Sequence, residues 1–86
     1  MMKRLYAIRD QLVGFKDPFV LVNDSVAQRA FATFVNDGKS DLYENPKYYD
    51  LYFIGEFDDE KGVLKKAEPT LICSALSVKK ENNVQD

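Results

Sequence analysis

The chain has 86 residues, of which 45% are hydrophobic and 30% are charged, and its formal net charge is −2. This composition is typical of one small globular domain and unlike that of a disordered chain. With no histidine and a single cysteine, Cys73, the chain excludes histidine-based catalytic triads, histidine metal sites and an internal disulfide. Because a domain of this size buries only about 60–65% of its unfolded surface, we expect a homodimer that covers more apolar area.

The first part of the chain predicts two antiparallel strands joined by a loop. Leu5-Tyr6-Ala7-Ile8 lies between basic residues and alternates weakly. Phe19-Val20-Leu21-Val22 follows the turn signals Gly14 and Asp17-Pro18. We therefore expect a hairpin at the start of the fold.

A helix is predicted next. Ser25, with Gln28 three residues later, has the spacing of a capping box, and Asn36-Asp37-Gly38 is a typical helix end. Apolar residues recur between them at helical spacing and predict one face that packs on a sheet, with Phe31 and Phe34 in the core. These residues are Val26, Ala27, Ala30, Phe31, Phe34 and Val35.

The second half of the chain predicts one short helical turn and three strands. Asn45-Pro46 starts the turn, and from Leu51 the apolar pattern alternates with a period of two, which is typical of a strand with Phe53 in the core. The acidic run at 58–62 predicts a turn before a short return strand at 63–66. A separate last strand, at 71–78, is set off by Pro69.

The element order is thus strand, strand, helix, strand, strand, strand. It predicts an α+β fold in which one amphipathic helix packs on a mainly antiparallel sheet of four to five strands. We expect a single domain at 1–78 and a flexible C-terminal tail at 79–86. The N-terminus is followed by no apolar segment long enough for a signal peptide or a membrane span, so we expect a cytoplasmic protein without a membrane partner.

Charge is distributed unevenly along the chain. Residues 1–35 carry a net charge of +2, residues 36–60 of −6, residues 61–80 of +4 and residues 81–86 of −2. Basic residues flank the first and last strands, and tyrosines lie near them, which is the combination found in sequence-tolerant binders of single-stranded DNA. A solvated surface, or lysines that protect sheet edges, explains the same pattern. The candidate nucleic-acid-binding residues are Lys3, Arg4, Tyr6, Arg9, Tyr49, Tyr52, Lys65 and Lys66.

The acidic middle of the chain supports a different function. Asp58, Asp59 and Glu60 would suit a basic protein partner, so a protein–protein adaptor without DNA affinity of its own is the alternative. The three acids lack the spacing of a calcium loop, and no pair of carboxylates indicates acid–base catalysis. We therefore expect no enzymatic activity, no metal and no cofactor.

Three linked segments carry a resemblance to a known family. They are Asp17-Pro18-Phe19, the run from Gln28-Arg29-Ala30-Phe31 to Val35-Asn36-Asp37, and the run from Asn45-Pro46 through Tyr49, Leu51-Tyr52, Ile54-Gly55 and Phe57-Asp58-Asp59. In these, and over about residues 5–76, the chain resembles the small nonstructural protein of gokushovirus-type microviruses, which are phages with single-stranded DNA genomes.

The resemblance implies a non-capsid protein of the infected bacterial cytoplasm that binds DNA or acts in genome replication. For the adaptor alternative, the resemblance implies a phage or host replication protein that the chain recruits or inhibits. It implies no catalytic residues. The matched positions are expected to mark the fold, with Gly55 at a bend or close approach and Asn36 and Asp58 at caps or turns. Arg29, a matched charge on the polar helix face, joins the DNA-binding candidates. The positions expected in the core are Ala30, Phe31, Leu51, Ile54 and Phe57.

Overall fold

A computed structural model describes residues 1–80 and shows an α+β fold. The strands are β1 (Met2–Asp10), β2 (Gly14–Phe15), β3 (Phe19–Leu21), β4 (Tyr49–Asp58) and β5 (Val63–Ser74). The helices are α1 (Asp24–Val35), α2 (Asp41–Glu44), the 3-10 turn η1 (Pro46–Tyr48) and α3 (Ala75–Val78). The predicted fold class, the main helix and the short turn after Asn45 are therefore confirmed.

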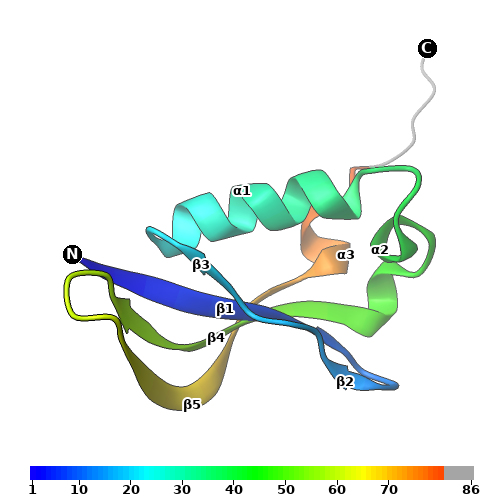
Figure 1. The fold of residues 1–86 in the computed structure, drawn as a ribbon. Helices are drawn as coiled ribbons and strands as arrows, with labels where there is room; N and C mark the ends of the chain where they lie inside the picture. Colours follow the sequence, from blue (N-terminus) through cyan, green and yellow to red (C-terminus); the bar gives the residue numbers. More distant parts are fainter. Residues whose placement is uncertain (81–86) are drawn as a thin grey trace.

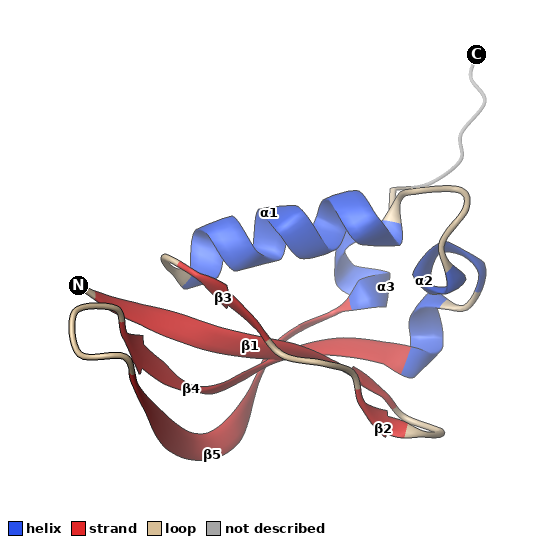
Figure 2. Cartoon of the chain, in the orientation of Figure 1, coloured by secondary structure: helices blue, strands red, loops and turns tan. Residues whose placement is uncertain are grey.

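The strands form one antiparallel sheet in the order β2-β1-β4-β5, and β3 also pairs with β1. Figure 1 shows α1 and α3 on the same side of this sheet, and Figure 2 shows the long strands passing beneath them. Among the described residues, no helix covers the other side of the sheet.

The core lies between α1 and the sheet. Ala27, Phe31 and Val35 are fully buried on the helix, where a spacing of four residues keeps them on one face. They meet Tyr6 and Ile8 of β1. The other buried members of the cluster are Leu42, Tyr49, Leu51 and Ala75, and Phe53 packs against them while partly exposed.

Three predictions for α1 are wrong. Ala30, which was expected in the core, is exposed. Phe34 is 46% exposed, because it lies to one side of the line formed by Phe31 and Val35, where no element within residues 1–80 covers it. The helix cap is Asn23 instead of Ser25. The extended backbone of Asn23 lets its side-chain oxygen accept a hydrogen bond from the Val26 amide at 2.9 Å, which satisfies a free N–H of the first turn.

The end of the chain also differs from the prediction. The two strands expected at 63–66 and 71–78 are one strand, β5, because Pro69 lies in an irregularity that needs no amide donor: Phe53 pairs with Thr70 and Gly55 pairs with Lys66. After Ser74 the chain turns into α3, because the Ser74 hydroxyl caps the Ser77 amide at 3.2 Å.

The expected tail at 79–86 lies only partly within the described residues. Lys80 donates its amide to the Asn36 side chain at 2.7 Å, and the Lys79 ammonium lies 4.2 Å from the centre of the Tyr43 ring. These contacts hold residues 79 and 80 against the helices. The rest of the expected tail, residues 81–86, lies outside the described residues.

Candidate nucleic-acid interface

The side of the sheet opposite α1 forms a continuous surface. Directly paired residues on neighbouring strands point to the same face, and sequence neighbours point to opposite faces. Because Tyr6 faces α1, Leu5 and Ala7 face away, together with their cross-strand partners. We call this surface the open face. Its positions are Lys3, Leu5, Ala7, Arg9, Phe15, Val20, Asp50, Tyr52, Gly55, Phe57, Leu64, Lys66, Leu71 and Ser74. Three of them, Ala7, Asp50 and Gly55, are buried by their neighbours.

The open face combines aromatic rings with cations. The rings of Phe15 and Tyr52 meet edge to face with their centroids 5.3 Å apart, and Phe15 is 49% exposed. Arg9 pairs directly with Phe15, and Lys66 lies across the sheet on β5. Within residues 1–80 neither cation makes an ion pair, whereas the Lys3 ammonium lies 3.5 Å from Asp59. Such a surface offers stacking to bases and charge to phosphates.

Four of the nine candidate residues from the sequence lie together on the open face. They are Lys3, Arg9, Tyr52 and Lys66. The first and last strands do not adjoin, because β4 separates them. On the open face, β4 also places Asp50 directly opposite Arg9. The cations of the open face are therefore spread across the sheet and do not line one continuous basic groove.

The other five candidates lie elsewhere. Tyr6 is fully buried and Tyr49 is 7% exposed, so both rings fill the core and neither offers a stacking surface in this structure. Lys65 is exposed but pairs with Glu56, which places it on the opposite face of β5 from Lys66. Arg29 is exposed on α1, beside Asn36 and Lys80.

Arg4 belongs to a network that anchors the start of α1. Its Nε donates to the Asp24 carboxylate at 2.9 Å, and the Tyr6 hydroxyl donates to the same oxygen at 2.6 Å. The guanidinium also lies 3.8 Å from the centre of the Phe53 ring. Both of these Arg4 interactions are internal, so Arg4 has a structural role in this fold.

Because of this network, we expect the stability of the fold to depend on pH and to fall in a Tyr6→Phe variant. Burial, and then the hydrogen bond to Asp24, raise the pKa of Tyr6 to about 12. The folded phenol holds its proton more tightly than the unfolded one, so this contribution to stability is complete below about pH 10 and is lost between about pH 10 and pH 12. We expect Tyr6→Phe to cost about 1–3 kcal/mol near neutral pH, measured by urea unfolding.

A comparison at high pH checks the cause. Between pH 10 and pH 12 the wild-type chain should lose stability more steeply than the Tyr6→Phe variant. Parallel pH profiles for the two chains would contradict the assignment of the phenol as the titrating group.

Phe15 and Leu71 are open-face residues that are missing from the sequence-based candidates. Phe15 belongs to a two-residue strand, which is too short for a pattern, and Leu71 was assigned to a separate last strand. In the sequence, only a weak alternation of polar and apolar residues surrounds them. The register of the sheet places Phe15 beside Arg9 and Leu71 beside Tyr52.

The acidic turn is largely occupied by local contacts. Asp58 accepts hydrogen bonds from the amides of Glu60 and Lys61, at 3.0 and 3.2 Å, so its predicted turn role is confirmed. Asp59 accepts from the N-terminal ammonium at 2.7 Å, which lowers the pKa of the carboxyl group and raises that of the amine. Within residues 1–80 no group of three potential ligands is placed to hold a metal ion.

The chain is thus a small α+β domain with helices on one side of its sheet and an aromatic, cationic surface on the other. It matches the family model described as Phage ORF5 protein over residues 3–78, and the chain therefore belongs to that family. Membership of this family confirms the expectation that the chain is a phage protein. Neither the curated proteins nor the solved structures gave a match. No helix within residues 1–80 is long and apolar enough to cross a membrane.

Proposed function

We propose that this phage accessory protein binds single-stranded DNA through its open face and regulates genome replication in the cytoplasm of the infected bacterium. The proposal includes the finer resemblance to the nonstructural proteins of gokushovirus-type microviruses and a role without catalysis. The observation that carries it is the open face, where Phe15 and Tyr52 stand beside Arg9, and Lys66 lies on the same face farther along β5.

The physical basis is stacking assisted by a few phosphate contacts. A base stacked on an aromatic ring contributes about 1–3 kcal/mol without regard to its sequence. Lys3, Arg9 and Lys66 allow up to three phosphate contacts. Each contact to a single strand contributes about −0.7 to the slope of log K against log salt, so a slope of about −2 is expected. A chain with a net charge of −2 suits this modest dependence better than tight coating of DNA.

The test compares two adjacent lysines of one strand. Lys66→Glu should weaken the binding of a labelled single-stranded oligonucleotide about five- to tenfold at low salt, because it replaces an attraction to phosphate by a repulsion. Lys65→Glu should change the affinity less than about twofold, because Lys65 lies on the other face of β5. Fluorescence anisotropy with the single strand and the matching duplex measures both effects.

The two variants have the same change of net charge, so they separate a surface contact from bulk electrostatics. Equal losses from Lys66→Glu and Lys65→Glu would contradict an interface on the open face. Absence of binding by the wild-type chain at low salt would overturn the proposal and favour the adaptor function. A basic phage or host replication protein would then be the partner of the exposed acids, such as Glu60, which is 80% exposed.

A further inference from the structure

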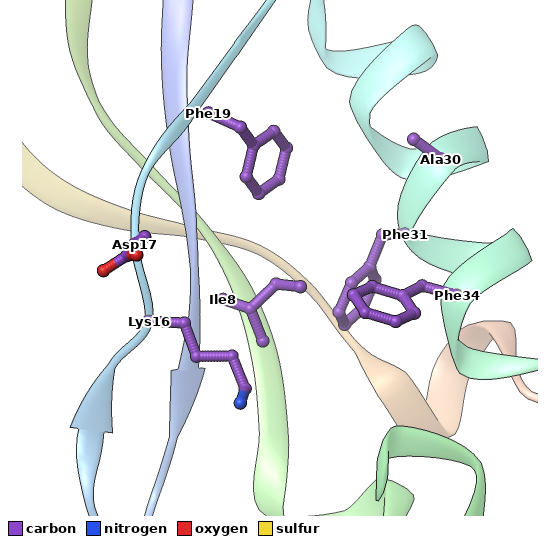
Figure 3. A pocket seen from close by; sticks show the side chains of 7 residues that line it. All are labelled: Ile8, Lys16, Asp17, Phe19, Ala30, Phe31 and Phe34. Atoms are coloured by element: carbon purple, nitrogen blue, oxygen red, sulfur yellow. The ribbon is translucent and has the colours of Figure 1, made fainter. Parts of the chain in front are cut away.

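An apolar groove of about 640 Å³ lies between α1 and the segment that links β2 to β3 (Figure 3). Ile8 and Phe31 belong to the core, so the groove reaches the core itself, and the half-exposed ring of Phe34 stands at its side. The groove is a candidate contact site because it opens directly onto core residues. The groove is lined by Ile8, Lys16, Asp17, Phe19, Ala30, Phe31 and Phe34.

A second apolar feature stands at the turn between β1 and β2. Leu12 and Val13 are 74% and 86% exposed, in a position where polar residues are the rule. The turn is well held: the Gln11 amide donates to the Tyr48 carbonyl at 2.8 Å, and the Leu12 amide donates to Asp10 at 2.9 Å. Two apolar side chains are therefore presented to solvent by an ordered turn.

The turn and the groove match in charge. The segment 11–14 carries no charged side chain, and the groove walls are apolar, so joining them buries no unpaired charge. Lys16 and Asp17 give the groove one cation and one acid, a balance that favours a neutral occupant over a strongly charged peptide or nucleic acid. The β1–β2 turn lies at the end of the sheet away from α1 (Figure 2), so the occupant comes from another molecule.

We propose that Leu12 and Val13 of one copy of this chain insert into the groove of a second copy. Each copy has one apolar turn and one groove, so a two-fold exchange uses both and closes the assembly as a dimer. The contact is small, and the dimer therefore forms weakly and in a concentration-dependent manner. The open face takes no part in it, so this dimer does not depend on DNA binding.

Cysteine cross-linking tests which surfaces meet. In a Cys73→Ala background, one sample carries Val13→Cys and a second, size-tagged sample carries Ala30→Cys in the groove. Mixing under mild oxidation should give a disulfide between the two samples. The control replaces Ala30→Cys by Thr33→Cys, which lies on the same helix outside the groove. Equal yields of the mixed disulfide in the two experiments would overturn the proposal.

Sedimentation of unlinked chains tests the energetics. Either Leu12→Ser with Val13→Ser, or Phe34→Gln, should raise the Kd of the dimer at least about tenfold, because each change replaces apolar side chains buried in the contact by polar ones. Leu76→Gln removes an apolar residue on α3 that is 59% exposed, and it should leave the Kd unchanged. A wild-type chain that stays monomeric at the highest concentrations, or turn variants that associate like the wild type, would refute the exchange.

Discussion

Phe31→Ala is expected to lower the free energy of unfolding by about 3–5 kcal/mol, a large share of the total stability of so small a domain. Phe31 is 1% exposed, and its ring lies between α1 and the sheet within the core that also holds Tyr6 and Leu51. Alanine would leave a cavity that the flanking strands cannot close without breaking their pairing. Urea unfolding followed by circular dichroism measures the loss.

Phe34 provides the matched control for Phe31→Ala. It is the same residue type on the same helix, but it is 46% exposed. Phe34→Ala should therefore cost less than about 1 kcal/mol, since its ring loses little burial. Similar losses for the two variants would show that the core does not lie on the Ala27–Phe31–Val35 side of the helix.

The elements with strong periodicity could be predicted from the sequence. The apolar residues from Val26 to Val35 have a clear period of 3.6, and those from Leu51 onward a period of 2. The structure has the helix at Asp24–Val35 and the strand at Tyr49–Asp58, which begins two residues earlier than predicted. The capping residue could not be assigned safely, because Asn23, Asp24 and Ser25 are all good caps and tertiary contacts decide between them: Asp24 is occupied by Arg4 and Tyr6.

The candidate site was harder to predict because it depends on register. The sequence alone does not distinguish Lys65 from Lys66. In the sheet, Lys65 pairs with Glu56 and Lys66 pairs with Gly55, so the two lysines lie on different faces. Tyr6 carries the same polar tip as Tyr52, but Tyr6 is fully buried beneath α1 whereas Tyr52 contacts Phe15 on the open face. Composition predicts that aromatic and basic residues are present, and only the sheet decides which of them share a surface.

Gly55→Ala is expected to lower the free energy of unfolding by about 1–3 kcal/mol, through a clash instead of a cavity. The expected close approach at Gly55 is confirmed: a Cβ atom there would collide with the carbonyl oxygen of Lys65 on β5. A backbone atom has no rotamer by which to escape, so β5 must move away from β4. Urea unfolding gives the energy, and amide exchange at 63–66 should show the loosened pairing.

Gly38→Ala is the control for Gly55→Ala, because a Cβ at Gly38 would meet no atom within 4 Å. It should be neutral or slightly stabilising, since alanine restricts the unfolded chain.

The clash at Gly55 also links stability to the proposed interface: Gly55 pairs with Lys66, so a displaced β5 carries an open-face cation with it. Gly55→Ala should then weaken single-stranded DNA binding even where the variant is folded. Unchanged stability and exchange would show that β4 and β5 do not approach this closely.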